Sequence, residues 1–87
     1  MYIINSLMDT VKLIRSFADL SLPDAKIIAE TWESAFHNNF KTNSLHEIRI
    51  LGSMCRMITS RRWVIDKNNV IMVNKPILLD DIKNLST

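Results

Sequence analysis

The single cysteine and the histidine nearest to it are placed too far apart for nucleophilic chemistry. Cys55 and His46 lie nine residues apart on one predicted helix. At about 100° per residue their side chains point to opposite sides of that helix, whereas an activated thiolate needs the imidazole in contact. Cys55 also falls on an apolar stripe, which is typical of a small core hydrophobe. A cysteine nucleophile is therefore not expected.

A second set of residues has a spacing that a metal site could use. Glu30, Glu33 and His37 share one face of a predicted helix. One helix supplies too few ligands, and the chain has no second Glu-x-x-His motif. Pairing of Lys26 with Glu30, and of Glu33 with His37, explains the same residues as a solvated face. A metal-dependent enzyme built on them is the weakest of three hypotheses, and we expect no catalytic, metal or cofactor site.

A row of hydrogen-bond donors gives the strongest indication of function. Five of them recur at helical spacing on one arc between residues 46 and 60, and that arc carries no acid. Three more basic residues lie in or beside a predicted hairpin. The candidate nucleic-acid-binding residues are His46, Arg49, Ser53, Arg56, Arg61, Arg62 and Lys67, to which Ser60 on the same arc adds a further donor. Arg49 is the candidate for a guanine edge, and the other cations are candidates for phosphate contacts. That the basic residues only keep the surface solvated stays open.

The charge distribution agrees with this assignment. The net charge is +2 overall, but it is −2 over residues 1–39, +5 over residues 40–75 and −1 over residues 76–87. The positive charge therefore collects on the segment that carries the donors, as expected for a surface that binds an anion.

Apolar periodicity predicts the elements that position these residues. A capping box at Ser44 and Glu47 begins the helix that carries the donors. A polar turn at residues 66–69 closes the hairpin, where asparagine tolerates positive φ, and Pro76 opens the last helix. The predicted elements are helices 3–20, 22–37 and 45–61, strands 62–66 and 70–73, and a helix 77–85.

The predicted fold class is mainly α. We expect one domain over residues 1–87, with three helices, a β-hairpin and a short C-terminal helix. The order of three helices followed by the hairpin resembles a winged helix, although the loop over residues 38–43 is longer than a tight helix-turn-helix allows. Trp32 is expected in the core. Gly52 lies in the middle of a helix, where it costs about 1 kcal/mol against alanine, so the close approach of another backbone is expected there.

The composition indicates more apolar surface than one small core can hide. The chain of 87 residues is 47% hydrophobic and has one glycine. We expect the surplus to meet a partner, most simply a second copy in a homodimer. The hydrophobic residues at expected exposed positions are Leu13, Leu20, Ile50, Met54, Met57, Met72 and Ile77–Leu79. They favour a rival function, a protein–protein interaction module such as a phage- or plasmid-encoded inhibitor or adaptor.

Cysteine content and hydropathy indicate the compartment. One cysteine cannot form an intramolecular disulfide. The chain has no run of about 18 apolar residues and no basic segment before an apolar N-terminal core, so we expect neither a membrane span nor a secretory signal. The leading expectation is a small cytoplasmic, non-enzymatic nucleic-acid-binding or regulatory protein that forms a homodimer.

Overall fold

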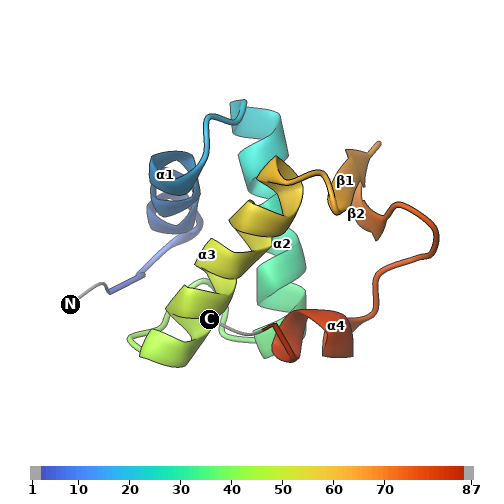
Figure 1. The fold of residues 1–87 in the computed structure, drawn as a ribbon. Helices are drawn as coiled ribbons and strands as arrows, with labels where there is room; N and C mark the ends of the chain where they lie inside the picture. The colour runs from blue at the N-terminus through green and yellow to red at the C-terminus, as the bar shows by residue number, and fades with distance from the viewer. Residues whose placement is uncertain (1–2, 86–87) are drawn as a thin grey trace.

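Three serines begin the three long helices of this chain. The side chains of Ser6, Ser21 and Ser44 each accept a hydrogen bond from the backbone N–H three residues later. Each helix also has an acidic residue in its first turn, where the helix dipole favours negative charge. The computed structural model describes residues 3–85 (Figure 1). Its elements are α1 (Leu7–Phe17), α2 (Leu22–Phe36), α3 (Leu45–Thr59), β1 (Trp63–Asp66), β2 (Asn69–Met72) and α4 (Leu79–Lys83). This order confirms the predicted fold class.

The first helix is shorter than predicted at both ends. Ser6 caps α1, and Ile4 lies outside it in an antiparallel bridge with Thr42. At the other end Ala18 is extended. Because α1 packs on its neighbours through a narrow stripe, Met8 and Phe17 remain exposed.

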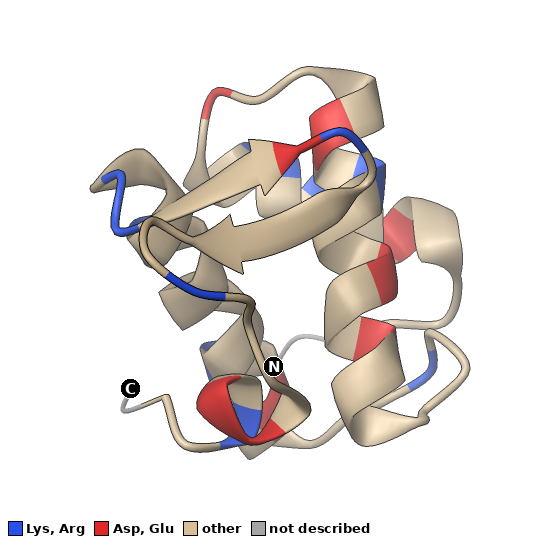
Figure 2. Ribbon diagram, turned by 90° about the vertical axis from the view of Figure 1, so that its right-hand side faces the viewer, with Lys and Arg blue, Asp and Glu red and all other residues tan. Residues whose placement is uncertain are grey.

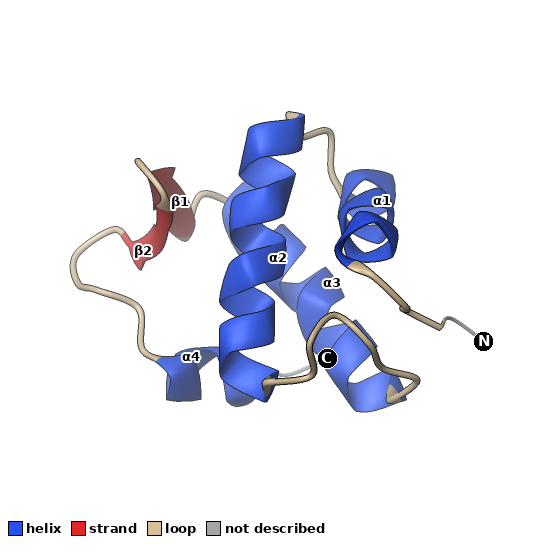
Figure 3. Ribbon diagram, turned by 180° about the vertical axis from the view of Figure 1, so that it is seen from behind, coloured by secondary structure: helices blue, strands red, loops and turns tan. Residues whose placement is uncertain are grey.

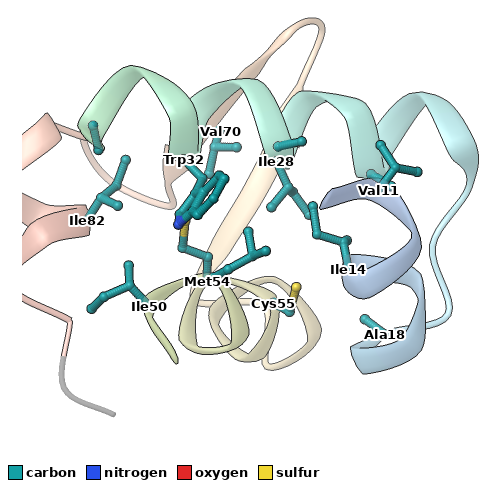
Figure 4. Packing of buried hydrophobic residues seen from close by; sticks show 14 of the residues in the cluster. Val11, Ile14, Ala18, Ile28, Trp32, Ile50, Met54, Cys55, Val70 and Ile82 are labelled. Atoms are coloured by element: carbon teal, nitrogen blue, oxygen red, sulfur yellow. The ribbon is translucent and has the colours of Figure 1, made fainter. Parts of the chain in front are cut away.

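Helix α2 lies at the centre of the fold. In Figure 3 it runs through the middle of the molecule, with α1 on one side and the hairpin on the other. It packs against α1, α3, α4 and β2. Trp32 is fully buried, as predicted, and its Nε1–H donates to the backbone carbonyl of Glu47 at 2.9 Å. In Figure 4 the indole lies between Val70 and Met54.

Helix α3 is buried more widely than its single predicted stripe. Ile50 and Met54 were expected at exposed positions, but both are fully buried. The reason is tertiary, because α3 is covered by α1 and α2 and also by β1 and α4. Of the other residues expected to be exposed, Leu13, Leu20, Met57, Met72 and Ile77 are half-buried, while Leu78 and Leu79 are exposed.

The start of α3 uses half of the predicted capping box. Ser44 accepts the Glu47 N–H as expected, but the Glu47 carboxylate accepts from the Asn38 side chain instead of reaching back. The Ser44 N–H donates to Thr42 Oγ1. Glu47 therefore ties the loop that ends α2 to the first turn of α3.

The hairpin forms as predicted, but β1 begins one residue later than expected and β2 lies one residue earlier. Trp63 pairs with Met72 at its base and Asp66 with Asn69 at its tip. Lys67, not an asparagine, takes the positive φ of the turn. Pro76 does not open a helix, because it bridges to Ile71, and α4 begins three residues later. None of the helices within residues 3–85 combines the length and apolar character that a membrane span requires.

Candidate nucleic-acid interface

Backbone hydrogen bonds at the C-terminal end of α3 fix the main chain of two candidate arginines. The Arg62 N–H donates to the Met57 carbonyl and the Arg61 N–H to the Ile58 carbonyl, both at 3.1 Å. This pair of bonds is a Schellman motif, in which the penultimate residue adopts a left-handed conformation. Arg61 has φ of 64°, a region that favours glycine. The motif stops the helix and turns the chain into β1, with both arginines exposed.

Three adjoining hollows connect the basic residues across one side of the protein. The first, called here the α1–α3 groove, has a volume of about 500 Å³ and is lined by Arg49 and Arg56. The second, also about 500 Å³, is lined by Arg56 and Arg62. The third, about 430 Å³ and beside the base of the hairpin, is lined by Arg62 and Lys75. We call Arg49, Arg56, Arg62 and Lys75 the basic track, because each shares a hollow with the next.

The basic track lacks local neutralisation. No Asp or Glu of the described chain lines any of its three hollows. Within residues 3–85, no basic side chain forms an ion pair with a carboxylate. Figure 2 shows basic segments entering and leaving the hairpin at its base, with acidic residues on α2 and α4 elsewhere. The surface therefore presents uncompensated positive charge to solvent.

Two candidates near the track have other roles. Ser53 was placed among the exposed donors, but it is only 4% exposed and its hydroxyl accepts from Arg56 Nη2 at 3.0 Å. It therefore helps to orient Arg56 instead of facing a ligand. The exposed His46 ring stacks edge-to-face on Phe36, with ring centroids 6.3 Å apart. Neither His46 nor Arg61 is among the described residues that line the three hollows.

Of the two lysines near the hairpin, the predicted Lys67 lies away from the basic track, whereas Lys75 belongs to it. Strand β1 spans about 10 Å from Trp63 at the base to Asp66, and Lys67 follows at the tip, so it stands apart from the track. Lys75, which the sequence analysis did not select, lies at the base, because the Met72 N–H donates to its carbonyl and turns the chain back. Its position between Asn74 and Pro76, two turn-forming residues after a strand, was the available signal.

A buried donor lies beside the third hollow. Trp63 lines this hollow and is 2% exposed, yet its indole Nε1–H has no acceptor among residues 3–85. Buried donors without acceptors are rare in folded proteins.

Replacing Arg61 by glycine is expected to raise the free energy of unfolding by about 1 kcal/mol. Glycine adopts the left-handed φ without the steric cost that an L-residue pays there. Urea unfolding followed by circular dichroism would measure the change. Arg61→Ala is the matched control, since it removes the same charge but keeps the strain. If both variants shift stability equally, the strain argument is wrong.

Cys55 is expected to resist modification in the folded protein. Burial raises the pKa of its thiol to about 12, and the side chain is 1% exposed. At pH 8 the folded protein should react with iodoacetamide far more slowly than the protein in urea, as mass spectrometry would show. Because only the unfolded thiol ionises near pH 9, this group also lowers stability as the pH rises above that value. Rapid labelling of the folded protein at pH 8 would contradict the buried placement.

The structure also locates the residues that the sequence analysis considered for nucleophilic and metal chemistry. Cys55 points from α3 into the core in Figure 4. In the part of the chain that the structure describes, no three His, Cys, Asp or Glu side chains gather closely enough to hold a metal ion. The Glu33 carboxylate instead accepts from the Asn39 backbone N–H at 3.1 Å.

Comparison of the chain with protein-family models, curated protein sequences and solved structures found no match.

Proposed function

We propose that this protein is a small, cytoplasmic, non-enzymatic nucleic-acid-binding protein whose basic track contacts the phosphate backbone. The proposal rests on three adjoining hollows. Together they are lined by the four cations of the basic track, and no described Asp or Glu lines them. Arginine forms charge-assisted bidentate bonds with phosphate, and lysine adds a point charge.

The structure favours contacts to the backbone over insertion of α3 into a major groove. A recognition helix needs an exposed middle turn to reach base edges. In α3, residues 50–51 and 53–55 are all buried, and only Gly52 breaks this run. Arg49 and Arg56 therefore flank a recess instead of projecting from a ridge. We propose phosphate contacts for Arg49 as well, in place of the guanine contact considered from the sequence.

The proposed homodimer is a separate matter from the basic track. The apolar residues that stay exposed near the C-terminal end include Val73, Leu78 and Leu79. They lie outside the three hollows except for Val73, so a dimer through them would leave most of the track open. Analytical ultracentrifugation is expected to show a dimer at micromolar concentration, and a monomer throughout would count against it.

A salt titration tests the proposed function. Fluorescence anisotropy of a labelled random-sequence duplex and a single strand is expected to show binding that weakens steeply with salt. If four cations each replace a counterion, log K falls against log salt with a slope of about −3.6 for duplex and about −2.8 for a single strand. Lys67→Ala is the matched control, because it removes a hairpin cation that lies off the track. No binding at low salt would refute the proposal, and a large effect of Lys67→Ala would move the interface to the hairpin tip.

A further inference from the structure

The α1–α3 groove has features that phosphate binding does not explain. Its floor is apolar, formed by Ile48 and Cys55 with Phe17 from α1. Phe17 is 45% exposed and Leu45, at one end, is 53% exposed. Large side chains left this accessible around a recess indicate a surface that another apolar group can cover.

The exposed face of α3 has the spacing of a helix-packing seam. Leu45, Arg49, Gly52, Arg56 and Thr59 follow one another at intervals of four, three, four and three residues. This is the heptad spacing with which one helix packs along another at a small crossing angle. All five line the groove, which therefore follows the length of α3.

Gly52 forms a notch in the middle of this seam. A Cβ placed on Gly52 would lie 3.7 Å from the Phe17 ring, which is ordinary contact, so no neighbouring backbone requires glycine there. The expectation that another backbone approaches Gly52 within this chain is therefore wrong. The missing side chain instead leaves space beside Phe17 that a leucine-sized group from outside could fill.

The two arginines on the seam indicate what kind of helix can bind in the groove. Arg49 and Arg56 are two helical turns apart, about 10 Å along the axis, with the notch between them. A second copy packed through this face about a two-fold axis at Gly52 would bring its own arginines against these two, and the like charges would repel. An acidic helix would instead bring carboxylates to both.

We infer that the α1–α3 groove binds an acidic amphipathic helix of another protein. One large apolar side chain of that helix fills the notch at Gly52 against Phe17. Two carboxylates seven residues apart on the helix have the same axial spacing as Arg49 and Arg56 and pair with them. This inference does not depend on nucleic-acid binding, although the helix would cover two cations of the basic track.

A designed peptide tests the inference with the full chain. The probe is a fluorescein-labelled helical peptide of about 20 residues, with leucines along one face and two glutamates seven residues apart beside the central leucine. A second peptide carries lysines in place of those glutamates. We expect the acidic peptide to bind at least about tenfold more tightly than its lysine form.

Variants of the notch assign the binding to the groove. Gly52→Leu fills the notch, and we expect it to weaken the acidic peptide by at least about tenfold. Gly52→Ala is the matched control, since it adds one methyl group in ordinary contact with Phe17 and leaves most of the space. Circular dichroism of both variants confirms that α3 is intact, and both replace glycine by a better helix former.

Five outcomes would overturn the inference, of which four concern the peptide and the dimer. They are no binding of the acidic peptide, equal binding of the two peptides, binding that Gly52→Leu leaves unchanged, and a dimer that Gly52→Leu dissociates, which would assign the groove to a second copy. Loss of nucleic-acid binding in Gly52→Leu, without any peptide binding, would assign the groove to nucleic acid and also overturn it. Failure of the salt titration alone would refute the proposed function and leave this inference standing.

Discussion

Replacement of Trp32 by alanine is expected to lower the free energy of unfolding by about 3–5 kcal/mol. The indole is fully buried, packs edge-to-face on Phe36 and bonds the Glu47 carbonyl across the α2–α3 contact. Its removal would leave a cavity where α2 meets α3 and β2. Small domains have total stabilities of about 5–15 kcal/mol, so this loss would be a large part of the total. Urea unfolding followed by circular dichroism would measure the loss.

Trp32→Phe separates the ring from its hydrogen bond. Phenylalanine keeps an aromatic ring in the same layer but has no N–H for Glu47, so we expect a smaller loss of about 1–2 kcal/mol. If Trp32→Phe costs as much as Trp32→Ala, the bond to Glu47 outweighs packing. A loss below about 1 kcal/mol for the alanine variant would contradict the central position assigned to this residue.

Reversal of two charges in the basic track is expected to abolish nucleic-acid binding at 100 mM salt. Arg56 and Arg62 each border two hollows, so Arg56→Glu with Arg62→Glu places a carboxylate in all three. Two favourable phosphate contacts are lost and two repulsive ones are created. Both side chains are exposed, so stability should change by only about 0.5 kcal/mol for each. Anisotropy at several salt concentrations would measure binding.

The matched control reverses two exposed charges elsewhere. Lys12→Glu with Lys41→Glu gives the same net charge as the track variant, and neither residue borders the track. We expect this control to retain most of the binding. Equal losses in the two double variants would show that net charge alone attracts nucleic acid, and the basic track would then have no special role.

The sequence was most informative where the structural signal is local. The capping box at Ser44, the polar turn of the hairpin and the apolar periodicity identified the elements in the correct order, because each depends on neighbours within a turn or two. The grouping of Arg49, Arg56 and Arg62 was also predictable, because helical spacing and the end of α3 place them near one another. The boundaries of α1 were less predictable, since Ile4 forms its bridge with the distant Thr42.

The sequence was less informative where distant segments decide the outcome. Ile50 and Met54 are buried because α3 packs against α1, α2, β1 and α4, which no pattern within α3 could reveal. Ser53 is buried with them and orients Arg56. Lys75 joins the track because the chain reverses after β2 and bridges back to Ile71 at Pro76. The α1–α3 groove likewise needs Phe17 to lie beside Gly52, a contact between two helices separated by a third.

The central position of α2 also leads us to expect an order for folding. Helices α1 and α3 adjoin α2 in the chain as well as in space, through connections over residues 18–21 and 37–44, so these contacts close short loops at small entropic cost. Such local contacts generally allow fast folding. Helix α4 has five residues and contributes Ile82 to the core that it shares with α2 and α3. We expect the C-terminal segment to dock after the first two-thirds of the chain has packed.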